Sequence, residues 1–355
     1  MNLFLPNIKK FLLLGLGVFL FSACIDEIRL DIDADQAKIT VDGFISDSLR
    51  VHSISLSNSS VFGVGNDNIQ PPISGASVGI RDGVGNFFSF EESTEAEGTY
   101  ERLMAGDVGQ TYQLEVSLPD GTEIRSKPII MPRRNELMGI DFEQIERTFI
   151  NTAGNVSTTV ELIVKIDSEL DSQDRPFFRW RTGGQFEFHE NYPMALSTKW
   201  CYISETLDFN QLELLDAREI EGNELRKKKI LSMALDSRFA WQYCFHIRQF
   251  SISEEEYTYW SNIQEILNTG GSLFDPPPGT VKGNLFNPAD ENEQILGFFS
   301  VASVSYKRYF CNPDILNRFI DPKCSAIPFR PQFPECRDCS IVLGSELEKP
   351  DYWIP

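Results

Sequence analysis

The stretch "ASVGIRDGVGNFFSFEE", residues 76–92, decides the fold of the first third of the chain. Asp82-Gly83 and Gly85-Asn86 at its centre are residues that tight turns favour, because glycine and asparagine tolerate a positive φ. The segments on either side of this turn are therefore predicted to be two neighbouring β-strands.

Segments on both sides of this stretch repeat the pattern. "KITVDGFISD" (38–47) and "HSISLS" (52–57) alternate their side chains with the period of two that half-buried strands show. Further strands are predicted in "GTYERLM" (98–104) and in "QTYQLEVSLPDGTEIRSKPIIMP" (110–132), which contains another Asp-Gly turn. About seven short strands within about 95 residues are typical of an immunoglobulin-like sandwich.

The region after this sandwich is also predicted to be rich in β-strands. "TTVELIVKIDSE" (158–169), "FFRWRTGGQFEFHE" (177–190) and "RFAWQYCFHIRQFSIS" (238–253) alternate apolar or aromatic residues with polar ones. We therefore expect a second, larger β-rich domain.

One amphipathic helix is predicted in "SEEEYTYWSNIQEILNTGG", residues 253–271. Ser253 is a suitable N-cap, acids fill the first turn, and apolar residues recur at helical intervals. Gly270 is a suitable end for the helix.

These patterns predict a mainly β chain with five parts. An immunoglobulin-like sandwich is followed by a β-rich domain with one helix and by a tail that disulfides hold on that domain. The predicted boundaries are a signal peptide at 1–23, an acidic tether at 24–36, the sandwich at 37–133, the second domain at 134–310 and the tail at 311–355.

The amino terminus is typical of an exported protein. Lys9 and Lys10 precede an apolar core, residues 11–21, which is too short to cross a bilayer as a helix. The segment "FSAC", residues 21–24, resembles the lipobox of bacterial lipoproteins, in which the cysteine receives the lipid. Cys24 is thus the predicted membrane anchor, and an ordinary secretory signal that contains a cysteine is the alternative.

Two acids follow Cys24 after one intervening residue, Ile25. Asp26 and Glu27 resemble the export signal by which bacteria of the Bacteroidetes type send lipoproteins to the outer face of the outer membrane. We therefore expect a lipid-anchored protein of the outer membrane that is exposed on the cell surface.

The charge of the chain excludes one class of partner. With 32 basic and 52 acidic side chains, the formal net charge is −20, and a field of that sign repels nucleic acid. The hydrophobic content of 41% is enough to fill the cores of two domains within 355 residues.

Six cysteines remain once Cys24 is assigned to the lipid, and an even number in an exported chain favours disulfides. Fifteen pairings are possible, and the sequence does not rank them. The motif "CRDC" is a weak candidate for zinc or redox chemistry, because the second C-x-x-C of a zinc site is missing. We expect no metal and no cofactor. The disulfide candidates are Cys201, Cys244, Cys311, Cys324, Cys336 and Cys339.

The histidines do not indicate catalysis. The chain has three, His52, His189 and His246, and the strand patterns predict structural roles for His52 and His246. The sequence contains no G-x-S-x-G nucleophile elbow. No catalytic residue is therefore assigned, although a Ser-His-Asp hydrolase stays open.

Four aromatic side chains are candidates for contact with a ligand or partner, because binding proteins use rings as platforms and interface hot spots are enriched in them. Rings also fill sandwich cores, and a core position is predicted for Trp180 and Trp241, which lie in alternating segments. The four contact candidates are Trp200, Tyr257, Trp260 and Trp353.

Several segments in a fixed order resemble one family. They include "KITVDGFISD", "PISGASVGIRDGVGN", "GQTYQLEVSLPDG", "ILGFFSVAS" and the ending "CRDCSIVLGSELEKPDYW". Together they resemble the outer-membrane lipoproteins of Bacteroidetes that carry domain of unknown function 4249. Within them, residues 73–121 are similar to the carboxypeptidase-regulatory or prealbumin-like sandwich. The resemblance implies association with a TonB-dependent receptor and brings no catalytic residues.

The predicted function is therefore that of a non-catalytic accessory or binding subunit of a TonB-dependent transporter, active in nutrient uptake. Its ligand would be an extracellular small molecule, peptide or glycan. An adhesive or scaffold lipoprotein of the envelope is the alternative, and an enzyme that degrades surface polymers is a third possibility. Specificity resides in loops whose geometry the sequence does not show.

Overall fold

A computed structural model describes residues 37–59, 71–171, 175–191, 198–207, 212–268, 281–290, 292–324 and 333–354. The chain divides into two compact units, and the fold reported below is that of the unit formed by Lys38–Ser60 and Asp67–Pro355. The predicted lipidation site Cys24 and the acids Asp26 and Glu27 lie outside the described residues.

The segment 76–92 forms a β-hairpin. Strands β3 (Ser77–Asp82) and β4 (Phe87–Glu92) pair antiparallel, with Val78 opposite Phe90, and Gly85 in the turn has a φ of 95°. Asp82 Oδ1 accepts hydrogen bonds from the backbone N–H groups of Val84 and Asn86, at 3.1 and 2.8 Å. The predicted pair of strands is thus confirmed.

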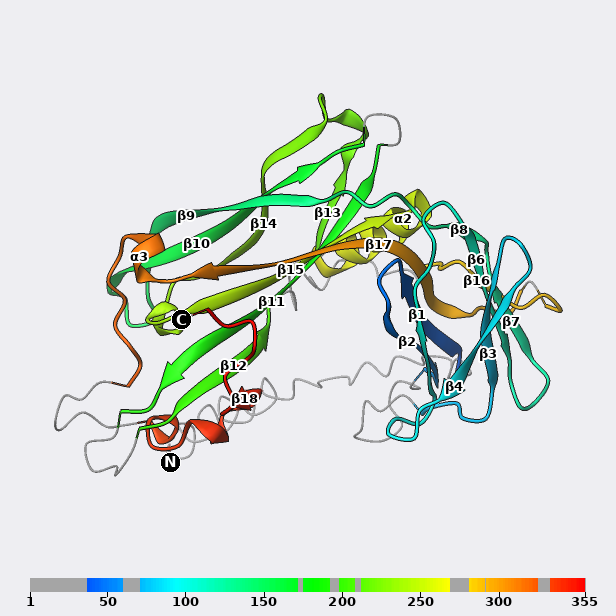
Figure 1. Cartoon of the computed structure of the whole chain (residues 1–355), viewed down its shortest axis with the longest axis horizontal. Coiled ribbons are helices and arrows are strands. Elements are labelled where there is room, and N and C mark those ends of the chain that lie inside the picture. Colours follow the sequence, from blue (N-terminus) through cyan, green and yellow to red (C-terminus); the bar gives the residue numbers. More distant parts are fainter. Residues whose placement is uncertain are drawn as a thin grey trace, which may run out of the picture. The chain divides into compact units, whose positions relative to one another are not determined.

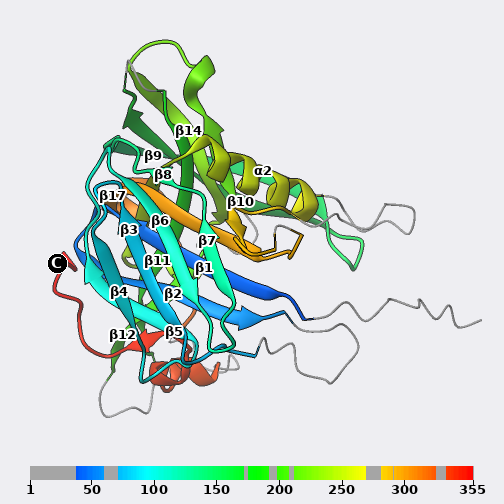
Figure 2. The same cartoon turned by 90° about the vertical axis from the view of Figure 1, so that its right-hand side faces the viewer.

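Strands β1 to β8, together with β16 (Leu285–Phe286) and the first half of β17 (Leu296–Cys311), form the amino-terminal part (Figure 2). One sheet has the order β17-β1-β2-β5, the other has the order β3-β6-β7-β16, and β4 pairs with β3 on one side and with β5 on the other. The strands are β1 (Ile39–Ser46), β2 (Arg50–Asn58), β3 (Ser77–Asp82), β4 (Phe87–Glu92), β5 (Thr99–Met104), β6 (Thr111–Ser117), β7 (Glu123–Ser126) and β8 (Ile129–Ile130).

The two sheets pack face to face around one apolar core. Val41 and Ile54 from one sheet and Ile80 and Leu114 from the other are completely buried in the same cluster. Each such side chain contributes roughly 1.5–3 kcal/mol through burial. Because strand residues alternate between faces, the polar residues next to Val41 and Ile54 face outward.

The second part is built from two further sheets. Residues of the small sheet, such as Leu162 and Ile166, share a buried cluster with Trp180 and Phe245 of the large one, so the small sheet covers one face of the large one. The small sheet consists of β9 (Leu137–Ile150), β10 (Val156–Glu169) and β14 (Glu224–Ala234); the large one consists of β11 (Phe177–His189), β12 (Trp200–Thr206), β13 (Glu213–Asp216), β15 (Tyr243–Ile252), β17 (Leu296–Cys311) and β18 (Ser345–Glu346).

Strand β17 belongs to both parts (Figure 1). Its first half pairs parallel with β1, from Leu296 to Ala302, and its second half pairs antiparallel with β15. Gly297 allows the close approach to β1, since its φ is 94° and a Cβ there would lie 2.0 Å from the carbonyl oxygen of Val41. The sandwich and the large sheet are therefore one continuous hydrogen-bonded ladder.

The predicted helix is confirmed as α2 (Glu254–Asn268). Ser253 Oγ accepts a hydrogen bond from the backbone N–H of Glu256 at 3.1 Å, as expected of an N-cap. Gly270 lies outside the described residues. The remaining helical segments are short, namely α3 (Pro313–Leu316), η1 (Ala217–Glu219), η2 (Ser237–Phe239), η3 (Pro334–Cys336) and η4 (Cys339–Ile341); the two-residue strand β16 (Leu285–Phe286) pairs with β7.

Four of the six candidate cysteines form disulfides. Cys201 of β12 bonds Cys339, which fixes the carboxyl-terminal tail to the large sheet, and Cys324 bonds Cys336 within the tail. The two cysteines of "CRDC" therefore have different disulfide partners and do not bond to each other.

Cys244 and Cys311 are free, buried thiols, so the prediction that they form disulfides is wrong. The register of β15 and β17 pairs Tyr243 with Cys311 and Cys244 with Phe310. Since opposite residues share a face and successive residues alternate, the two thiols project from opposite faces of the sheet. Burial raises the pKa of each thiol to about 12.

Candidate functional site

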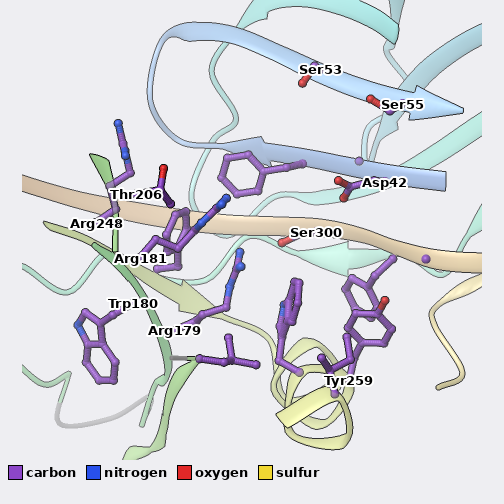
Figure 3. A pocket seen from close by; sticks show the side chains of 18 of the residues that line it. Asp42, Ser53, Ser55, Arg179, Trp180, Arg181, Thr206, Arg248, Tyr259 and Ser300 are labelled. Carbon is purple, nitrogen blue, oxygen red and sulfur yellow. The ribbon is translucent and has the colours of Figure 1, made fainter. Parts of the chain in front are cut away.

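A cleft of about 860 Å³ lies between the outward face of β1 and β2 and the part of the large sheet formed by its interior strands β11 and β15 (Figure 3). Helix α2 and the first half of β17 complete its walls. The residues that line it include Thr40, Asp42, Phe44, Arg50, Ser53, Ser55, Arg179, Arg181, Thr206, Arg248, Phe250, Tyr259, Trp260, Phe298 and Ser300.

Three arginines come from the large sheet. Arg181 of β11 lies directly opposite Arg248 of β15, and Arg179 lies two residues before Arg181, on the same face of its strand. Arg50 at the start of β2 adds a fourth guanidinium from the sandwich. The cleft is therefore positively charged in a chain whose net charge is −20.

Arg179 is fixed among aromatic rings. Its guanidinium lies over Phe250 at 4.8 Å and over Trp260 at 4.5 Å from the ring centroids, and it is 3.8 Å from the carboxylate of Glu256. Trp260 Nε1 donates a hydrogen bond to the same carboxylate at 3.1 Å. Burial raises the pKa of Glu256, and the charge of Arg179 opposes this shift. Helix α2 thus holds one arginine of the cleft in place.

The opposite wall is polar and carries a negative charge. Asp42, Ser53 and Ser55 lie on the outward faces of β1 and β2 (Figure 3). The walls of the cleft remove bulk water around Asp42 and raise the pKa of its carboxyl, while the positive charges of Arg179 and Arg181 lower it. The cleft therefore has a cationic side and an anionic side.

Of the four predicted contact residues, Trp260 lines the cleft. Tyr257 packs on Phe177, with ring centroids 5.1 Å apart, and joins the apolar cluster under α2. Trp353 is buried against Tyr202 of β12, with ring centroids 5.1 Å apart. The structure thus brings one of these candidates to the cleft and uses Tyr257 and Trp353 in packing.

Trp200 lies away from the cleft, at the far end of β12. It is 53% exposed and stacks on His189, with ring centroids 4.4 Å apart, while Trp241 stacks on the same imidazole at 4.0 Å. The core position predicted for Trp241 is wrong, since its side chain is 43% exposed, whereas the core position of Trp180 is confirmed. Trp241 is exposed because β15 begins two residues later, at Tyr243.

The cleft lies within the range that identifies the family. Residues 25–308 match a family model described as Domain of unknown function (DUF4249). The chain belongs to this family. The match covers all the cleft-lining residues and ends before the disulfide-bonded tail. No curated protein matches the chain. Membership of the Bacteroidetes and likeness to the prealbumin-like sandwich stay predictions.

The histidines of this DUF4249 chain have structural contacts. His52 is buried in the sandwich and lies 3.2 Å from the carbonyl oxygen of Ser48. His246 Nδ1 lies 2.6 Å from the hydroxyl of Tyr306. Burial and two nearby arginines lower the pKa of His246 to about 4, so this imidazole is neutral at physiological pH.

Two other findings concern metals and membranes. Within the described residues, no group of three or more histidine, cysteine or acidic side chains is placed to hold a metal ion. Among the helices that the structure describes, none has the length and apolar character needed to span a bilayer.

The arginines of the cleft were missed in the sequence because they lie far apart, at positions 50, 179, 181 and 248. A local signal does exist in "FFRWRT", where Arg179 and Arg181 occupy one face of an otherwise apolar and aromatic strand. Charged residues are rarely buried unless paired, so this pattern marks a special position.

Proposed function

We propose that this chain is a lipoprotein of the outer membrane, exposed on the cell surface, that binds a ligand for a TonB-dependent transporter. The cleft between the sandwich and the large sheet carries this proposal. Its volume of about 860 Å³ lies in the range of ligand pockets, and rings and polar groups converge in it.

The residues of the cleft favour binding over the degradation of polymers. Of the described residues that line it, one is a carboxylate, Asp42, and none is a histidine or cysteine. Glycoside hydrolysis generally needs two carboxylates on either side of the bond that is cleaved. Arginines, hydroxyl groups and rings are instead the groups by which proteins hold and orient a ligand.

The sequence before the fold supports attachment to a membrane. Cys24 is the first residue of the short acidic segment 24–36. This segment lies before β1 in the sequence and would tether the folded part to the lipid. Lipidation of one cysteine with several acyl chains exceeds what stable anchoring requires. The binding cleft would then remain close to a transporter in the same membrane.

The test is an affinity pull-down from detergent-solubilised outer membranes through a carboxyl-terminal tag. We expect stoichiometric recovery of a TonB-dependent receptor with the wild-type chain. The Cys24→Ala variant should leave the membrane fraction, which checks the anchor independently. Recovery of the membrane-bound chain alone would favour the adhesive or scaffold alternative.

A further inference from the structure

We infer that the tip of the β9–β10 hairpin enters the surface of a lipid bilayer. The tip consists of Phe149, Ile150 and Val156 with the turn at 151–155 between them. This inference rests on the proposed attachment to a membrane, and it adds a second membrane contact that is separate from both the lipid anchor and the cleft. The partner is the lipid surface itself and not a protein.

The first argument is that apolar side chains cover both faces of the tip. Ile150 lies opposite Val156, and Phe149 lies opposite Ser157, so Phe149 points to the other face. Ile150 and Val156 are each 73% exposed, and Phe149 is also exposed. A docking surface for a protein needs only one face of an element, whereas a tip that enters a bilayer meets lipid on every side.

The tip lies beyond the core that the rest of the hairpin covers. Phe142 of β9 and Leu162 of β10 are the residues nearest to the tip that pack in the core cluster. Helix α3 supports β9 before the tip begins, since Gln144 Nε2 donates a hydrogen bond to the carbonyl oxygen of Leu316 at 2.7 Å (Figure 1). The apolar side chains of the tip therefore take no part in the core of the described residues.

The second argument is that no charged group has to leave water. Residues 148–160, "TFINTAGNVSTTV", contain no charged side chain. The next residues on the two strands, Arg147 and Glu161, form an ion pair across the hairpin. From Arg147 to Ile150 a strand rises about 10 Å, which is about the depth that interfacial segments reach in a bilayer. The ion pair would thus remain at the level of the lipid headgroups.

The turn at the tip satisfies its own hydrogen bonds. Asn151 Oδ1 accepts hydrogen bonds from the backbone N–H groups of Ala153 and Asn155, both at 3.0 Å. The carbonyl oxygen of Asn151 accepts another from the N–H of Gly154 at 2.9 Å. Polar backbone groups are costly to move out of water unless they are bonded internally, and these groups are. The turn can therefore enter the headgroup region without losing its structure.

The third argument is the length of chain between the proposed anchor and the fold. Lys38, where the compact unit begins, lies 14 positions after Cys24. An extended chain spans at most about 3.5 Å per position, so the lipid holds the fold within about 50 Å of the bilayer. The local concentration of lipid at the tip is then high, and even a weak contact becomes populated.

Vesicle binding tests the inference on the purified chain from residue 25 onward, which contains the whole compact unit but carries no lipid. The probe is vesicles of phosphatidylethanolamine with a minor share of phosphatidylglycerol, and sedimentation measures the bound fraction. We expect weak, reversible binding, so the Cys24→Ala variant still leaves washed membranes. Added salt should preserve or strengthen this binding, because the contact is apolar and salt screens the repulsion between anionic lipid and an acidic chain.

The variant Ile150→Thr/Val156→Thr removes an apolar cross-strand pair from the tip and keeps β-branched side chains. We expect its affinity for the vesicles to fall at least about tenfold, because burial of apolar surface drives the contact. The matched control is Val51→Thr/Leu103→Thr, a cross-strand pair of β2 and β5 whose side chains are 52% and 63% exposed. The control should bind like the wild type, and both variants should melt near the wild-type temperature because the replaced side chains are exposed.

A dye that senses its environment reports the depth of the tip. Thr152→Cys places the label in the turn at the tip, and Val84→Cys places it in the turn between β3 and β4. The free thiols of Cys244 and Cys311 are buried, so the new thiol is the one that is labelled. We expect vesicles to raise the emission of the dye at position 152 and to leave that of the dye at position 84 unchanged.

The inference is overturned if the wild type does not bind the vesicles, if the tip variant binds them like the wild type, or if the dye at position 152 does not respond. A tip variant that loses the receptor in the pull-down, in a chain without vesicle binding, would identify a protein contact instead. The wild-type pull-down tests the proposed function separately. Recovery of the receptor without vesicle binding would reject the membrane contact and leave the proposed function standing.

Discussion

The disulfide between Cys201 and Cys339 should stabilise the fold more than the one between Cys324 and Cys336. The bonded cysteines are 138 and 12 positions apart, respectively. In the chain-entropy model, the longer closed loop lowers the free energy of folding by about 5 kcal/mol and the shorter one by about 3 kcal/mol. Removing the longer connection should therefore cost about 2 kcal/mol more.

The local environments of the two bonds favour a clean comparison. All four cysteines are buried, so replacement of each pair by serines introduces hydroxyl groups into similar surroundings. Most of that common cost cancels in the difference between the two variants. The backbone N–H of Cys339 also donates a hydrogen bond to Glu190 at 2.8 Å, a contact that serine preserves.

The assay is urea unfolding of two purified double variants, Cys201→Ser/Cys339→Ser and Cys324→Ser/Cys336→Ser, followed by tryptophan fluorescence. The wild type under oxidising conditions is the reference, and the fully reduced wild type should be less stable than either variant. Equal losses of stability, or a larger loss on removal of the short connection, would refute the loop-length argument.

Three further predictions follow from single positions. Gly297→Ala should destabilise the fold by at least about 3 kcal/mol in urea unfolding, because the new Cβ would meet the backbone of Val41. Gly85 has a similar φ but open space around it, so the control variant Gly85→Ala should cost only about 1–2 kcal/mol. The imidazole of His246 should titrate in NMR near pH 4. Because its folded pKa lies below the ordinary value of 6.5, the stability of the fold should decrease as the pH drops from about 6.5 toward 4. A titration of His246 near pH 6.5 would contradict the burial argument. The folded pKa of Glu256 is raised, so the contribution of this carboxyl to stability is full below its ordinary pKa of 4.5 and is lost as the pH rises through the raised pKa. Glu256→Gln should abolish this part of the pH dependence of unfolding. An unchanged pH profile in this variant would contradict the prediction.

The elements of the fold were largely predictable because they depend on local patterns. The hairpin at 76–92 and the helix at 254–268 occur where turn residues, caps and periodicity placed them. Disulfide pairing was not predictable, because it depends on which face of a sheet each cysteine occupies. Cys244 and Cys311 failed as candidates for this reason, although they lie on neighbouring strands.

The cleft was the least predictable feature. Arg181 and Arg248 become neighbours only through the register of β11 and β15, and Arg50 reaches the same cleft from the sandwich. The aromatic contact candidates gave a partial signal, since Trp260 lines the cleft while Tyr257 and Trp353 pack in the interior. A side chain on an alternating strand has two possible faces, and sequence alone does not say what covers each face.

The sequence by itself determined the mainly β character, the turns and the helix with its cap, because these depend on residues that are neighbours along the chain. It also determined the family, through the order of several segments along the chain. Only the tertiary structure decided that β17 joins the sandwich to the large sheet, which cysteines bond and where the arginines meet. These features depend on contacts between residues far apart in the sequence, and such contacts are fixed by strand register and the packing of sheet faces.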